Sequence, residues 1–196
     1  MTFPLHIVIG PNVFGAGNFG DDLMLAGFVD RLPSAVRITA FTPHDIESQR
    51  RRFPQVTWLA DDDAARDTAL EDAVMWLALG DTPFQLDSGP WMLDFLMRER
   101  ERCARSRIPM VYLGVGCESE AAAQDPRSRA LLAAATRVWT RDGLSTELLS
   151  AAYPGALIQT GSDLAHLEFE LGVSPTPEPG VLGLLIAYER EGVVPA

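Results

Sequence analysis

Residues 5–22 read LHIVIGPNVFGAGNFGDD, and this stretch decides the fold. The apolar run 5–9 predicts a strand, because a short apolar run that stops at Gly-Pro is typical of strands. A glycine-rich loop follows, and residues 21–32 then carry apolar side chains at helical spacing until Pro33. Strand, glycine-rich loop and helix in this order are typical of the opening of a doubly wound α/β sheet.

The same alternation of apolar runs and amphipathic segments continues along the chain. It predicts an α/β fold, with a doubly wound, mostly parallel, Rossmann-like sheet of about seven strands and helices on both faces. Strands are predicted at 5–9, 36–41, 56–59, 73–79, 110–113, 137–140 and 157–160, and helices at 21–32, 44–52, 90–106, 128–135 and 143–152.

Two charged stretches have structural interpretations. The triplet Asp61–Asp63 is predicted to cap the N-terminus of a helix, where the helix dipole favours carboxylates. The alternating charges of residues 98–102 predict a solvated, self-paired helix end rather than a binding patch. His6 lies within the first predicted strand and is interpreted as a packed core residue.

The composition changes after Gly172. Residues 1–173 are expected to form a Rossmann-like N-terminal domain, and the proline-rich residues 174–180 a semi-rigid linker. Residues 181–196 are expected to hold the first strand of a truncated second domain.

Composition also excludes several classes of function. The net charge of -11 argues against a binder of nucleic-acid backbones or anionic membranes. All 16 basic residues are Arg, so a Schiff-base lysine and a Walker-type phosphate loop are excluded. The longest apolar runs have about eight residues, far short of a membrane span. Two distant cysteines, Cys103 and Cys117, predict reduced thiols in a cytoplasmic protein without a bound metal.

Gly15, Gly17 and Gly20 have the spacing of a dinucleotide-binding fingerprint. However, Asp21 and Asp22 bring negative charge to the helix N-terminus that a pyrophosphate would approach. A nicotinamide or flavin dehydrogenase is therefore disfavoured, and no cofactor is predicted. Two interpretations stay open: a tight loop with Asp21 as the helix N-cap, or polar side chains that hold sugar hydroxyls.

Five loops, each at the end of a predicted strand, carry a resemblance to a known family. Each loop contains glycines or polar residues (Asn, Asp, Gln or Arg) that resemble a loop motif of the polysaccharide pyruvyl transferase family. The five motifs occur in the same order as in that family. The similarity covers nearly the whole chain, and residues 181–184 correspond to the first strand of the family's second domain. The loops are FGAGNFGDD (14–22), ALGDTPFQLD (78–87), YLGVG (112–116), TRDGLS (140–145) and TGSDLA (160–165).

The resemblance implies a GT-B-like architecture, with two Rossmann-like domains and a cleft between them. It implies transfer of the pyruvyl group of phosphoenolpyruvate to two hydroxyls of a saccharide or lipid-linked sugar as a ketal, by a chain that could form a homo-oligomer. Because the resemblance also implies donor-binding basic residues in the second domain, this chain alone is expected to be inactive. Gly80-Asp81-Thr82 departs from the family's triple glycine. The alternative is a noncatalytic sugar- or nucleotide-binding domain.

The candidate site residues all follow predicted strands, so they are expected at the carboxyl edge of the sheet. Asp21, Asp163 and His166 are the candidate catalytic residues, because ketal formation requires proton transfer. Arg141 could bind phosphate or carboxylate, with a structural salt bridge as the alternative. The predicted substrate-binding residues are Gly17, Asn18, Gly20, Asp22, Asp81, Gly116, Arg141 and Asp142.

Overall fold

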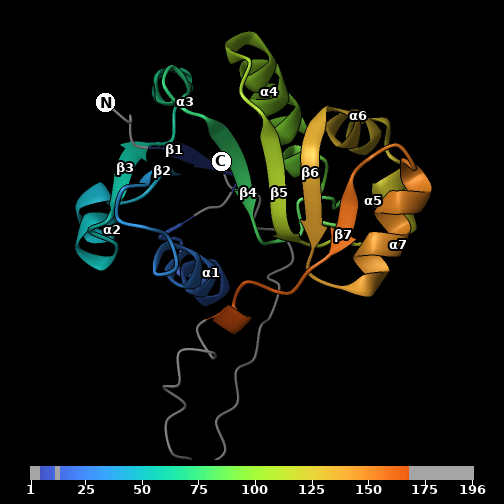
Figure 1. The fold of residues 1–196 in the computed structure, drawn as a ribbon, viewed down its shortest axis with the longest axis horizontal. Helices are drawn as coiled ribbons and strands as arrows, with labels where there is room; N and C mark the ends of the chain where they lie inside the picture. The colour runs from blue at the N-terminus through green and yellow to red at the C-terminus, as the bar shows by residue number, and fades with distance from the viewer. Residues whose placement is uncertain (1–4, 12–13, 168–196) are drawn as a thin grey trace, which may run out of the picture.

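The structure, a computed structural model, describes residues 5–11 and 14–167. Its seven strands form one sheet in the order β3-β2-β1-β4-β5-β6-β7, and all of its strand pairs are parallel (Figure 1). The predicted doubly wound, Rossmann-like α/β fold is therefore confirmed. Residues 168–173, the predicted linker and the predicted strand of a second domain lie outside the described residues.

The strands and helices alternate along the chain, as parallel pairing requires. The strands are β1 (His6–Gly10), β2 (Arg37–Thr42), β3 (Val56–Ala60), β4 (Met75–Leu79), β5 (Met110–Val115), β6 (Ala135–Thr140) and β7 (Ile158–Thr160). The helices are α1 (Phe19–Val29), α2 (Ile46–Arg52), α3 (Asp63–Leu70), α4 (Trp91–Ser106), α5 (Glu120–Gln124), α6 (Pro126–Ala134) and α7 (Gly143–Ala152). The sequence interpretation missed α5.

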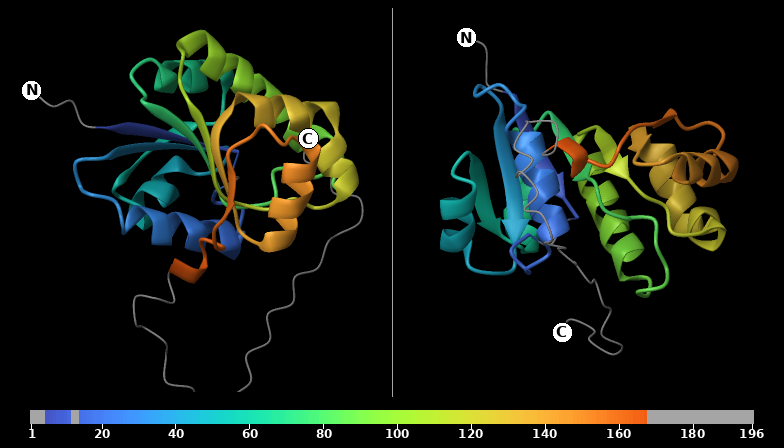
Figure 2. Two further views of the ribbon diagram at one scale, coloured as in Figure 1. Left: turned by 45° about the vertical axis from the view of Figure 1, so that its right-hand side comes forward. Right: turned by 90° about the horizontal axis from the view of Figure 1, so that it is seen from below.

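Both faces of the sheet are buried, which explains the continuous apolar run in β4. Side chains of β4 alternate between two cores: Trp76 and Ala78 pack with α3, α4, α6 and α7, whereas Leu77 and Leu79 pack with α1. Figure 1 shows α1 and α2 on one side of the sheet and α3, α4 and α6 on the other. β7 forms an edge of the sheet next to α7 (Figure 2).

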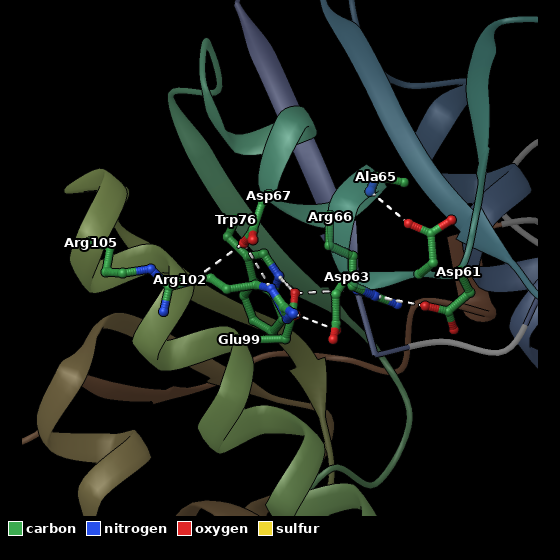
Figure 3. Close-up of polar contacts among 10 residues, drawn as sticks. Asp61, Asp63, Ala65, Arg66, Asp67, Trp76, Glu99, Arg102 and Arg105 are labelled. Carbon is green, nitrogen blue, oxygen red and sulfur yellow. Dashed lines mark hydrogen bonds and ion pairs between the residues drawn. The ribbon is translucent and has the colours of Figure 1, made fainter.

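The charged run of residues 98–102 is not the solvated helix end that the sequence predicts. Glu99 and Arg102 are 1% and 7% exposed, because this part of α4 packs against α3 and β4. Glu99 Oε2 accepts hydrogen bonds from Trp76 Nε1 at 2.9 Å and from Arg66 Nη1 at 3.2 Å, and Glu99 Oε1 accepts one from Arg102 Nη1 at 3.2 Å (Figure 3). The buried carboxylate is therefore satisfied from three directions.

The two guanidinium groups extend this network to the start of α3. Arg66 lies 4.2 Å and 4.6 Å from the ring centres of Phe41 and Phe95 and donates to Asp61 at 2.7 Å. The predicted helix cap is confirmed for Asp62, whose side chain accepts from the backbone N–H of Ala65. The acidic triplet thus both caps α3 and compensates buried arginines.

We predict that Glu99→Ala lowers the free energy of unfolding by about 3 kcal/mol, because it leaves two buried guanidinium groups and the Trp76 indole without their shared acceptor. Urea denaturation followed by tryptophan fluorescence measures this loss. The matched control, Glu101→Ala, removes an exposed carboxylate from the same helix and should change stability by less than about 0.5 kcal/mol. Equal effects of the two substitutions would contradict the assignment.

Candidate functional site

The candidate site lies at the carboxyl edge of the sheet, where β1 and β4 are neighbours. Strands β2 and β3 follow β1 in the sequence and lie on one side of it in the sheet. Strand β4 lies on the other side of β1 and begins the second half of the sheet. The loops after β1 and β4 therefore diverge at this point, which is where open α/β sheets bind ligands. The described residues of these loops are 11, 14–18 and 80–90.

The N-cap of α1 is Asn18 and not Asp21. The side-chain oxygen of Asn18 accepts a hydrogen bond from the backbone N–H of Gly20 at 3.1 Å. Asp21 is instead in the first turn and is 5% exposed. The interpretation of Asp21 as a helix cap is wrong. Capping therefore does not explain why this carboxyl group is buried.

Three carboxylates interact at this edge. Burial, followed by the charges of Asp81 and Asp22, raises the pKa of Asp21 to about 7, although a hydrogen bond with Asn18 opposes the shift. Asp22 is 7% exposed, and its Oδ2 accepts a hydrogen bond from Arg52 at 2.6 Å. Its Oδ1 has no partner among the described residues. The site therefore holds a carboxyl group that can gain or lose a proton near neutral pH.

The β4 loop is strained and close-packed next to these carboxylates. Gly80 has a φ of +68°, and a Cβ at this position would lie 2.0 Å from the sulfur of Met24 in α1. Asp81 has a φ of 64°, which is uncommon for a residue with a side chain, and its side chain accepts from the N–H of Thr82 at 2.6 Å. Such strain is concentrated at functional sites.

The β5 loop joins Asp81 to the predicted Arg-Asp motif. The N–H of Gly116 donates to the carbonyl of Asp81 at 2.7 Å, and a Cβ on Gly116 would lie 2.8 Å from the guanidinium carbon of Arg141. Arg141 lies 3.6 Å from Asp142, which caps α7 by accepting from the N–H of Ser145. This hydrogen bond lowers the pKa of Asp142, so its carboxylate stays ionised. Asp142 therefore has two structural contacts, the salt bridge with Arg141 and the cap of α7, and the sequence interpretation did not foresee the cap.

The remaining predicted residues lie at the margin of this group. Asp163 accepts from the N–H of Ala165 at 2.9 Å, and His166 Nδ1 lies 3.2 Å from Ser162 Oγ in the turn after β7. This turn approaches the end of β5, since the Ser162 carbonyl would be 3.1 Å from a Cβ on Gly114. The catalytic roles of Asp21, Asp163 and His166 stay predictions. Gly17 and Gly20 are exposed, Gly17 with a φ of +83°.

Sequence reasoning missed three residues of the site. Arg52 and Gln49 are on α2, and Gln49 is 3% exposed, with no partner for its Oε1 among the described residues. Glu118 accepts from the backbone N–H groups of Leu86 and Asp87 at 2.6 Å and 3.0 Å and so joins the loops after β4 and β5. Because these contacts span about 30 residues of sequence, no local pattern could reveal them.

Two further findings concern ligands and membranes. Over residues 5–11 and 14–167, no group of His, Cys, Asp and Glu side chains is arranged to hold a metal ion. In the same part of the chain, no helix combines the length and the apolar character that crossing a membrane requires.

Comparisons with known proteins show the fold. No family model and no curated protein matches the chain. Among solved structures, HepE of Anabaena in complex with UDP and glucose has a TM-score of 0.55 and 11% identity, over 81% of this chain and 44% of HepE. Triphenylmethane reductase of Citrobacter sp. with NADP(H) has a TM-score of 0.40 and 14% identity, over 56% of this chain and 37% of the reductase, which is too weak for an argument. This chain spans less than half the length of HepE.

We predict that stability depends on pH through Asp21. Its pKa is about 7 in the folded state and about 4 in an unfolded chain, so the folded state binds more protons between these values. The contribution of Asp21 to stability is therefore fully present below about pH 4 and is lost as the pH rises through about 7. Asp21→Asn removes the buried charge and should raise the free energy of unfolding at pH 8 by about 2–4 kcal/mol relative to the parent, with little change at pH 4.

Urea denaturation at both pH values measures this difference. Asp125→Asn is the matched control, because the hydrogen bond from Arg127 lowers the pKa of Asp125 and its carboxylate is stabilising. This control should lose stability at pH 8. A destabilised Asp21→Asn at pH 8 would contradict the prediction.

Proposed function

We propose that this chain forms one wall of a carbohydrate-binding cleft and belongs to an enzyme that modifies saccharide hydroxyls. The observation that carries the proposal is the carboxyl group of Asp21, which has a raised pKa and lies with Asp22 and Asp81 where β1 and β4 diverge. Carboxylates and amides on a glycine-rich loop suit a polyol, because hydroxyls donate to their oxygens. The buried Oδ1 of Asp22 has no partner among the described residues, so it adds negative charge beside Asp21.

The chemistry of the site supports an acid–base role for Asp21. A group with a pKa of about 7 exchanges protons efficiently at neutral pH, and here it can remove the proton of a bound hydroxyl. Asp163 and His166 are the further proton-transfer candidates. Arg141 is half-buried beside the β5 loop and offers a planar guanidinium to a phosphate or carboxylate.

The specific reaction that we propose is transfer of pyruvyl from phosphoenolpyruvate to two hydroxyls of a saccharide or lipid-linked sugar. It follows from the resemblance of the five loops to polysaccharide pyruvyl transferases. Similarity of the fold to HepE, whose crystal structure contains UDP and glucose, supports a sugar ligand more broadly. We further propose a cytoplasmic protein, in line with the buried free thiols of Cys103 and Cys117.

The second candidate function is a noncatalytic sugar- or nucleotide-binding domain. The same fold comparison favours it, because HepE binds a nucleotide as well as a sugar and this chain spans less than half of that protein. A ligand held in a two-domain cleft needs both walls for water exclusion and catalysis. We therefore expect residues 1–173 by themselves to bind a sugar or nucleotide weakly and to show no pyruvyl transfer.

We predict that Asp21→Asn weakens saccharide binding about tenfold or more, because it removes a charged acceptor of a ligand hydroxyl. Isothermal titration calorimetry with glucose, UDP-glucose and UDP measures the affinities at pH 8. The matched control is Asp30→Asn, at the exposed C-cap of the same helix, which should bind like the parent. Because Asp21→Asn is expected to be more stable than the parent at this pH, a loss of binding cannot result from unfolding.

Two outcomes would overturn the proposal. If neither sugar nor nucleotide binds to the parent chain, the cleft wall is not a carbohydrate site. If Asp30→Asn weakens binding as much as Asp21→Asn, the effect does not come from the acidic group. Release of phosphate from phosphoenolpyruvate in the presence of an acceptor saccharide separates pyruvyl transfer from simple binding.

A further inference from the structure

A second polar cluster lies at the opposite, amino edge of the sheet. Strand alternation places His6 of β1 and Arg37 and Thr39 of β2 on one face, since His6 is paired with Arg37 and Val8 with Thr39. Thr57 of β3, the register partner of Thr39, continues the row. The end of α3 and the turn before β4 cover this row with Asp72.

The cluster surrounds a cavity of about 340 Å³, which is large enough for a small organic ligand. We call it the amino-edge cavity. His6 and Thr39 are each 3% exposed, whereas Asp72 is exposed at the side. The lining residues are His6, Arg37, Thr39, Thr57, Leu59, Thr68, Ala69, Glu71 and Asp72.

The contacts within this cluster form a directed chain when the proton is on His6 Nδ1. His6 Nε2 lies 2.8 Å from Thr39 Oγ1, and His6 Nδ1 lies 2.7 Å from Asp72 Oδ1. With the proton on Nδ1, the ring donates to the carboxylate, and Nε2 accepts the hydroxyl proton of Thr39. The hydroxyl, imidazole and carboxylate then have the hydrogen-bonded order of a nucleophile, a general base and an orienting acid.

We propose that Thr39, His6 and Asp72 hydrolyse small uncharged acyl esters that bind in the amino-edge cavity. Thr39 Oγ1 attacks the carbonyl carbon while His6 Nε2 takes its proton, and the C–O bond of the ester then breaks. The leaving alcohol takes the proton from His6, and an acyl-threonine ester remains. Water attacks this ester with His6 again as the base, which releases the carboxylic acid and restores Thr39.

The surrounding charges are compatible with this chemistry. Arg37 forms an ion pair with Asp72 and so holds the orienting carboxylate beside His6, with the guanidinium Nη2 2.8 Å from His6 Nδ1. Burial lowers the pKa of His6, and the charge of Arg37 adds to this, although the hydrogen bond with Asp72 opposes it. The imidazole is therefore neutral at pH 7, as a general base must be. Glu71 adds a negative charge to the lining, which favours an uncharged substrate over an anion.

The test uses p-nitrophenyl acetate as the probe with the full 196-residue chain. We predict ester hydrolysis above the buffer rate and a transient acetyl group on the tryptic peptide 38–50, which contains Thr39, detected by mass spectrometry after acid quenching. Thr39→Val removes the hydroxyl and should lower the rate about 100-fold and abolish the adduct, whereas Thr39→Ser should keep both. The matched control, Thr136→Val, alters an exposed threonine of β6 and should behave like the parent.

His6→Gln supplies an independent readout, because it should slow acylation while Thr39 and the cavity are kept. The amino-edge cavity and the acidic group of Asp21 lie at opposite edges of the sheet, so ester hydrolysis and saccharide binding are measured independently and failure of one proposal is distinguishable from failure of the other. The proposal is overturned if peptide 38–50 carries no acetyl group, if Thr39→Val hydrolyses the ester at the parent rate, or if Thr136→Val slows it equally.

Discussion

Parallel pairing is the constraint on which the rest of this structure depends. Two parallel strands cannot be joined by a tight turn, so each strand must be followed by a crossover, which here contains a helix. Every strand-to-helix loop consequently lies at the carboxyl edge, and every helix-to-strand turn lies at the amino edge. The acidic group beside Asp81 and the cavity beside His6 both follow from this separation, at opposite edges of one sheet.

The two most buried acidic environments of the fold have opposite physical consequences. Glu99 lies in the core with two guanidinium groups and an indole N–H around it, and it joins α4 to α3 and β4. Asp21 lies beside Asp22 and Asp81 without comparable compensation, so its charged form is disfavoured. A buried carboxylate that is paired with cations and N–H donors links the elements that supply them. A buried carboxylate without such partners lowers stability and is typical of a functional site.

The pattern of apolar residues predicted most of the fold. Burial of one or both faces of a strand or helix gives its apolar residues a regular spacing, or a continuous run, that can be read from the sequence. All seven strands were found to within a few residues. The short helix α5 was missed, since five residues carry no measurable period. The run Arg98–Arg102 was misjudged for a different reason: its alternating charges look solvated until α3 packs over Glu99 and Arg102. For the site, the glycine-rich loops predicted Asn18, Asp21, Asp81, Gly116 and Asp163 at the carboxyl edge of the sheet, but they did not predict the raised pKa of Asp21.

By itself the sequence determined the class of the sheet, the loops that reach its carboxyl edge, and the exclusion of lysine chemistry, because these depend on local composition and order. Only the tertiary structure decided which carboxylates are charged. The cap of α1 belongs to Asn18, the raised pKa belongs to Asp21, and His6 meets Thr39 and Asp72 across 33 and 66 residues of sequence. Solvent exposure and the distance to a partner set the energy of a charge, and both quantities exist only once the chain has folded.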